Sequence, residues 1–315
     1  MRLTATFAGL STALAVGGCG GDGGSARRPT APTPTAPAVA SPESPTPRFA
    51  SYEPSAVEPY RNGKRLAGRV AQRMTTYDAG SSARSVAVAA GVPVALLRPV
   101  VDPAARSAGQ VLYAQLSGVT ATSLGAMVVV RQHLETGAGR RRVTRVIDVR
   151  LRRGGGAWSL DRVASSGGTP APRPERLSRG AERVLDHEAI ALPDTARWDI
   201  HRGRVDDALL RVLADAGDRR PISVSVLRTG HPANVWMTDR RSAHRLGRAA
   251  DVYAVGARSV IRQRRPGSPA QALARELVAG GAAQVGSPWD LPPGPPRTFT
   301  DRVHQDHLHL QQEPG

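Results

Sequence analysis

Two segments rich in proline and glycine set the limits of what this 315-residue chain can fold into. Residues 19–50 contain seven prolines among Gly, Ser, Thr and Ala residues, a composition that cannot bury a core and predicts a disordered tether. Residues 166–176 contain a glycine pair and three prolines, which is typical of a linker. We therefore predict two folded segments, residues 51–165 and 177–315, each long enough to enclose its own core.

The amino terminus is typical of an export signal. After Met1 and Arg2, a largely apolar stretch continues to Val16, which suits a signal-peptide core and is too short for a bilayer span of about 20 residues. Small residues then precede Cys19, the single cysteine of the chain, and this arrangement resembles the lipobox of bacterial lipoproteins. We expect residues 1–18 to be a lipoprotein signal peptide, and lipidated Cys19 to anchor an extracytoplasmic protein to the cell membrane. An ordinary signal peptide with an incidental cysteine is the alternative.

Composition narrows the classes of partner and of metal site. The net charge is +17, and more than half of it lies in residues 51–165, so the surface should attract anionic polymers. The chain has no zinc-finger, basic-zipper or aromatic RNA-binding motif, and with an export signal we expect anionic cell-wall polymers rather than nucleic acid. A single cysteine excludes a disulfide framework and cysteine-based metal sites. Any metal must therefore be held by His and carboxylate side chains.

Segment 51–165 predicts a small α+β accessory domain. Apolar residues recur at helical spacing between Arg61 and Tyr77. Further along the chain the apolar period changes to two, and we expect strands over residues 110–120, 125–135, 143–152 and 157–164. Helices followed by a four-stranded antiparallel meander resemble the cone-shaped cystatin-like or nuclear-transport-factor-like domains. The segment offers no convergent set of acids, bases or ligands, and we interpret His133 as a structural or surface residue.

Segment 177–315 carries the residues that could perform chemistry. Six of the eight histidines lie beyond residue 200, three of them in the sequence His-Gln-Asp-His-Leu-His at 304–309. A catalytic zinc site needs three N or O ligands and an open position for water. His244, Asp251 and one histidine of the carboxyl-terminal cluster meet that need, and Gly247 allows a tight turn between the first two.

The order of these residues resembles a known enzyme family. The pattern Ser-x-His-x-x-Gly-x-Ala-x-Asp at 242–251, followed by His-x-His, is similar to that of zinc D-alanyl-D-alanine carboxypeptidases, murein endopeptidases and hedgehog-type domains. These proteins share a small α+β metal fold, which the resemblance implies for about residues 177–315. It also implies that His244, Asp251 and His309 bind Zn²⁺.

The same resemblance implies catalytic roles. Asp306 is in the place of the family's catalytic Asp or Glu, and His307 matches the first histidine of the pair. Arg228, at the end of a predicted strand, is in the place of the arginine that binds the substrate carboxylate. In a regular strand the side chain of Asp306 would point away from those of His307 and His309, so we predict a bend before His307.

These residues lead to two classes of function. The first is a lipid-anchored zinc metallopeptidase that hydrolyses peptidoglycan stem or cross-link peptides, of the D,D-carboxypeptidase type or, alternatively, a murein endopeptidase. In this hypothesis Asp306 accepts a proton from a zinc-activated water and His307 stabilises the oxyanion. The second is a non-catalytic envelope-binding or assembly lipoprotein that retains the fold. For His231 and His304, a supporting role beside the metal and mere proximity are both open.

Overall fold

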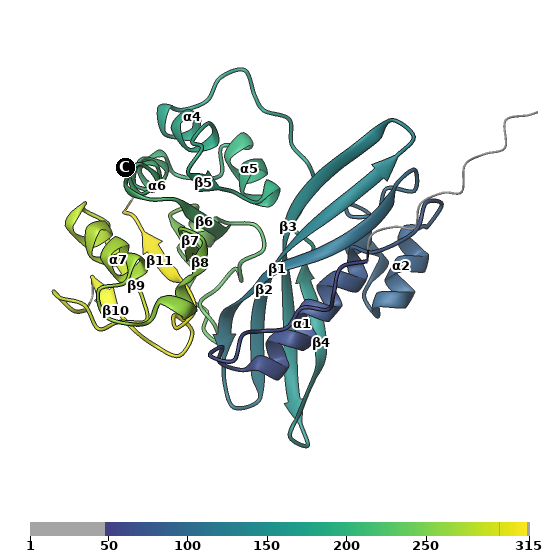
Figure 1. Cartoon of the computed structure of the whole chain (residues 1–315), viewed down its shortest axis with the longest axis horizontal. Helices are drawn as coiled ribbons and strands as arrows, with labels where there is room; N and C mark the ends of the chain where they lie inside the picture. Colours follow the sequence, from purple (N-terminus) through teal and green to yellow (C-terminus); the bar gives the residue numbers. More distant parts are fainter. Residues whose placement is uncertain (1–47, 296, 314–315) are drawn as a thin grey trace, which may run out of the picture. The chain divides into compact units, whose positions relative to one another are not determined.

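A computed structural model describes residues 48–295 and 297–313 (Figure 1). The predicted signal peptide, Cys19 and nearly all of the predicted tether lie outside the described residues. The described residues belong to one compact unit with two sheets, each of which has its own hydrophobic core. The predicted α+β class is therefore confirmed. Within the described part of the chain, no helix combines the length and apolarity needed to span a bilayer.

Residues 48–165, here called the amino-terminal module, contain an antiparallel meander. Its strands pair in chain order and are β1 (Arg106–Val119), β2 (Ser123–Thr136), β3 (Gly139–Gly154) and β4 (Ala157–Ser165). The four predicted strands are confirmed. β3 begins earlier than predicted and includes Arg140–Arg142, because it pairs with β2 as far as Gly139 and this exposed end accepts charged side chains. Gly155 and Gly156 turn the chain between β3 and β4 with positive φ angles of 57° and 86°.

Helices α1 (Arg61–Met74), α2 (Ala83–Ala90) and α3 (Val94–Leu97) share the core of this module. α1 lies along the sheet (Figure 1), and it buries Ala67, Val70 and Met74 in the core. The predicted helix is confirmed as far as Met74, whereas Tyr77 follows its end. The same face of α1 also buries Lys64 completely. An amine this deep in a protein requires a charged or hydrogen-bonding partner.

Residues 177–313, here called the carboxyl-terminal module, contain a mixed sheet. Its strand order is β10-β9-β11-β7-β6-β5, and β8 pairs with β7. The strands are β5 (Ile190–Ala191), β6 (Ile222–Val226), β7 (Ala249–Val255), β8 (Arg258–Ser259), β9 (Gln284–Gly286), β10 (Thr298–Phe299) and β11 (Leu308–Gln311). β7 and β11 are central neighbours.

Helical segments complete the core of the carboxyl-terminal module. They are α4 (Arg179–Leu185), α5 (Asp194–His201), α6 (Asp207–Arg219), α7 (Pro269–Ala279) and the short 3₁₀ segments η1 (His244–Leu246) and η2 (Val260–Gln263). Ser268 caps the start of α7, because its side chain accepts the Gln271 backbone N–H at 3.3 Å. Gly280 caps the other end of the helix. The more specific likenesses to known domain folds stay predictions.

The segment predicted to be a linker, residues 166–176, is held by hydrogen bonds to both modules. The carbonyl oxygen of Gly168 accepts from the Arg145 guanidinium of β3 at 2.9 Å, and that of Gly167 accepts from the Thr195 hydroxyl of α5 at 3.1 Å. A small apolar cluster of Met127, Val146 and Val226 also joins β2 and β3 to β6. The two modules are therefore in direct contact.

Candidate metal centre

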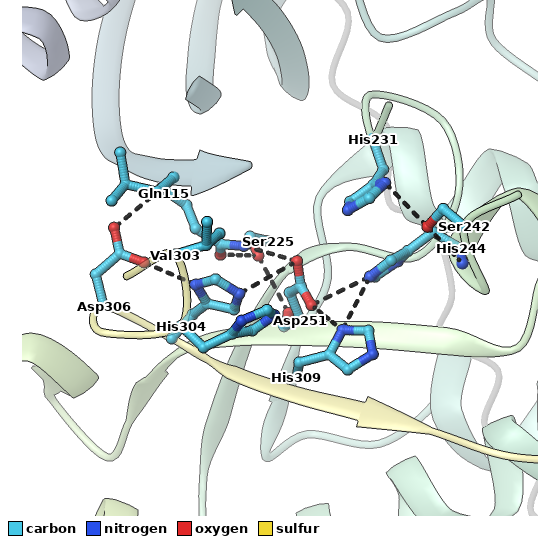
Figure 2. Close-up of polar contacts among 12 residues, drawn as sticks. Gln115, Ser225, His231, Ser242, His244, Asp251, Val303, His304, Asp306 and His309 are labelled. Carbon is cyan, nitrogen blue, oxygen red and sulfur yellow. Dashed lines mark hydrogen bonds and ion pairs between the residues drawn. The ribbon is translucent and has the colours of Figure 1, made fainter. Parts of the chain in front are cut away.

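Three side chains that the sequence predicts as metal ligands converge in the structure (Figure 2). Asp251 lies in β7 and His309 lies opposite it in β11, because the two strands pair antiparallel in that register. His244 begins the 3₁₀ turn η1 just before β7. Asp251 Oδ1 lies 3.2 Å from His244 Nε2 and 3.0 Å from His309 Nδ1, and the two histidine nitrogens are 3.3 Å apart.

The spacing of these three donor atoms, here called the ligand triangle, is similar to that of ligand atoms around a tetrahedral metal ion. Ligand bonds of about 2.0–2.2 Å place neighbouring ligand atoms of a tetrahedral zinc site roughly 3.3–3.6 Å apart, and the observed distances of 3.0–3.3 Å are at or just below that range. His244 Nδ1–H donates to the Leu227 carbonyl oxygen at 2.7 Å, so the lone pair of Nε2 is free to bind a metal ion. Burial lowers the pKa of His309 to about 4, which leaves this ring neutral at neutral pH, as metal ligation requires.

His231 is a further histidine at this site. Its ring stacks on that of His244 with centroids 3.9 Å apart, and ligand atoms of His231, His244 and Asp251 lie within 4.8 Å of one another. These three residues could hold a metal ion. Burial, followed by the neighbouring His244, lowers the pKa of His231 well below its ordinary value. The sequence left the role of His231 open. The residue lies in a Gly-His-Pro loop that follows β6, and this loop is the local sequence feature that could have indicated a role for it.

The turn that places His244 depends on a glycine, as predicted. Gly247 ends η1 with a φ of 74°, a left-handed conformation that other residues rarely adopt. A Cβ atom at this position would lie 2.2 Å from the Arg204 carbonyl oxygen. The backbone therefore approaches a neighbouring segment too closely for any side chain at residue 247.

Asp306 and His307 form a buried pair beside the ligand triangle. Both lie before β11 begins, so the predicted bend is present. Asp306 Oδ1 accepts from His307 Nδ1–H at 2.7 Å, and Oδ2 accepts from Lys64 Nζ at 2.5 Å and from the Leu116 N–H at 3.0 Å. The carboxylate is completely inaccessible, and its two oxygens are occupied by these donors.

The electrostatics of the pair distinguish its two members. Burial alone would raise the pKa of Asp306, but Lys64 and His307 hold it below its ordinary value. Burial would lower the pKa of His307, but Asp251 and Asp306 together raise it above its ordinary value. Asp306 is thus a stabilised carboxylate with little tendency to accept a proton, whereas His307 has the greater basicity.

The ligand triangle lies in a cavity of about 470 Å³. His231, His304 and His307 line it with the three ligands, and Leu116 and Trp236 contribute apolar surface. Three exposed arginines also line it: Arg240, Arg241 and Arg302. This combination of a ligand set, a basic side chain and cationic groups suits the binding of an anionic substrate near a metal.

Two sequence-based assignments differ from this arrangement, because neither Asp306 nor Arg228 is among the described residues that line the cavity. Asp306 lies behind His307 and contacts the amino-terminal module instead. Arg228 follows β6, and burial together with the charges of Arg245 and Arg204 lowers its pKa. The sequence placed Arg228 correctly after a strand but could not give the path of the following loop.

Comparisons with known proteins return nothing for this chain: no family model matches it, and neither do any curated proteins or solved structures at a significant level.

Proposed function

We propose that this protein is a zinc-dependent peptidase that hydrolyses peptidoglycan stem peptides at the outer face of the cell membrane. The observation that carries the proposal is the triangle of His244, Asp251 and His309 donor atoms, with edges of 3.0–3.3 Å, open to a cavity. When bound there, zinc would supply a Lewis acid that lowers the pKa of a water molecule toward 7.

In this proposal His307 is the proton acceptor. Its Nδ1–H is committed to Asp306, so its lone pair is on Nε2, which lies 3.8 Å from Asp251 Oδ2 beside the ligand triangle. A base within reach of the reacting water accepts a proton and later returns it to the leaving amine. Asp306 holds the tautomer and orientation of His307, so the role first assigned to Asp306 passes to its neighbour.

The cationic side of the cavity supports a substrate with a carboxylate. Arg240, Arg241 and Arg302 present guanidinium groups that can hold a carboxylate through paired hydrogen bonds. A terminal carboxylate held in this way favours D,D-carboxypeptidase action over cleavage of cross-links by a murein endopeptidase. Arg228 is replaced in this role by the arginines of the cavity.

Metal content tests the ligand assignment. We expect one zinc per purified chain, and near-complete loss of zinc in the variants His244→Ala and His309→Ala, because each removes one of three protein ligands. His133→Ala is the matched control, since His133 lies in β2 and bonds Gln110 away from the site. Full zinc occupancy in either ligand variant, measured by atomic emission, would refute the assignment.

Product analysis tests the reaction. The full chain, loaded with zinc, is incubated with free pentapeptide stems and with cross-linked dimers, and the products are identified by mass spectrometry. We expect loss of the terminal residue from free stems, abolished by a chelator and restored by zinc. Cleavage confined to cross-linked dimers would establish the endopeptidase alternative. Tight binding without products would favour the non-catalytic envelope lipoprotein.

A further inference from the structure

Strand β1 of the amino-terminal module contacts a metal ligand directly. Gln115 in β1 donates from Nε2 to Asp251 Oδ2 at 2.7 Å, and its other amide atom, Oε1, accepts from the Ser225 hydroxyl. The Gln115 side chain is completely inaccessible. These contacts fix which oxygen of Asp251 faces Gln115, and they leave Oδ1 directed at the two histidine ligands (Figure 2).

A second contact from the same module fixes the Asp306–His307 pair. Lys64, the single lysine in the sequence, extends from α1 and forms ion pairs with Glu58 and Asp306. The Leu116 N–H, next to Gln115 in β1, donates to the same Asp306 oxygen as Lys64. An ammonium group this deeply buried is stable only where its carboxylate partners are held in place.

We propose that the amino-terminal module is the built-in supporting shell of the metal centre, with Gln115 as the positioning residue for Asp251 and Lys64 as the positioning residue for His307. The inference rests on the metal site of the proposed function, and it gives residues 48–165 a role other than binding the cell wall. Gln115 is 136 residues from Asp251 in the sequence, and Lys64 is 242 residues from Asp306.

Zinc affinity tests the role of Gln115 without any need for peptidase activity. In Gln115→Met the side chain keeps its length and loses its donor to Asp251, and we expect zinc to bind about 10–100-fold more weakly, which is typical when an outer-shell partner of a ligand is removed. Gln132→Met is the control, because Gln132 is an equally buried glutamine of the same sheet whose partners, Val100, Ser107 and Arg145, are not metal-site residues. Affinities come from competition with a chromophoric chelator.

The Co²⁺-substituted protein supplies a spectroscopic readout that loss of stability alone would not change. We expect the visible absorption bands of bound Co²⁺ to shift in Gln115→Met and to match the parent in Gln132→Met. Equal zinc affinities and equal Co²⁺ spectra in the two variants would overturn the role of Gln115. If the parent chain binds zinc but cleaves no muropeptide, the proposed reaction is refuted and the role of Gln115 is not. The comparison of zinc affinities still decides whether Gln115 positions Asp251.

Lys64 requires a paired substitution, because its removal alone would leave two buried carboxylates without a cation. In Lys64→Met/Glu58→Gln one charge of each sign is removed, and Asp306 loses its cation while it keeps the Leu116 N–H. We expect zinc affinity to stay within about threefold of the parent, and kcat to fall by about 10-fold or more with little change in KM. A parental kcat, or zinc affinity lost as severely as in His309→Ala, would overturn this role.

Discussion

The His307 ring lies between two carboxylates, with Nδ1 2.7 Å from Asp306 and Nε2 3.8 Å from Asp251. We predict that His307→Gln retains zinc and lowers kcat by about 10²–10⁴-fold, the usual contribution of a general base. His304→Gln is the control, since His304 lines the same cavity but bonds Asp301. If turnover of pentapeptide stems is lost in the His304 variant and kept in the His307 variant, the base is His304.

The arginines of the cavity give a second prediction for single residues. We expect Arg240→Ala/Arg241→Ala to raise KM about 10-fold or more for stems with a free carboxylate, because a charge-assisted pair of hydrogen bonds is lost. Arg228→Ala should leave KM unchanged, since Arg228 is not among the residues that line the cavity. Steady-state kinetics on the free pentapeptide compare the two variants. The reverse result would restore Arg228 as the carboxylate ligand.

The extent to which the sequence predicts this site depends on the distance between partners along the chain. His244 and Asp251 are close in sequence, so spacing was enough to group them with one histidine of the carboxyl-terminal cluster. The family resemblance implied that this histidine is His309, which lies opposite Asp251 in the strand pairing. Lys64 and Gln115 were missed because their contacts with Asp306 and Asp251 cross between modules. No local periodicity predicts such contacts, and a buried lysine in an amphipathic helix resembles an ordinary polar residue in the sequence.

At the level of secondary-structure elements, the turn between η1 and β7 determines where His244 lies. We predict that Gly247→Ala lowers the free energy of unfolding by more than the roughly 1–2 kcal/mol cost of a left-handed residue, because a Cβ would also lie 2.2 Å from the Arg204 carbonyl oxygen. Gly256→Ala is the control: its φ is 60°, but its Cβ would meet nothing within 4 Å. Urea unfolding that gives equal losses for the two variants would contradict this account.

Strands were easier to predict from the sequence than the contacts made by the segments between them. In β3 the apolar residues Ile147, Val149 and Leu151 alternate with charged ones, and the four predicted strand positions agree with β1 to β4. Residues 166–176 have the composition of a free linker, yet their carbonyl groups accept from Arg145, Thr195 and Arg202. Composition predicts the absence of regular structure in such a segment, but it does not predict whether neighbouring side chains bind its backbone.

For the molecule as a whole, the contacts between modules predict that the two cores unfold together. The Lys64–Asp306 ion pair, the hydrogen bonds of residues 166–176 and the cluster of Met127, Val146 and Val226 all join one core to the other. Unfolding one module would expose these groups on the other, and a buried charge without its partner is strongly destabilising. We therefore expect a single cooperative transition.

Zinc makes this cooperativity measurable, because a ligand that binds the folded state alone at 100 times its Kd adds about 2.7 kcal/mol to the free energy of unfolding. If the modules unfold as one unit, zinc should protect amides of β2, in the amino-terminal core, as strongly as amides of α6 in the other core. Hydrogen exchange in urea, with and without zinc, measures both sets in one sample. Protection confined to α6, with β2 exchanging at its zinc-free rate, would mean that the modules unfold separately and that the contacts between them contribute little stability.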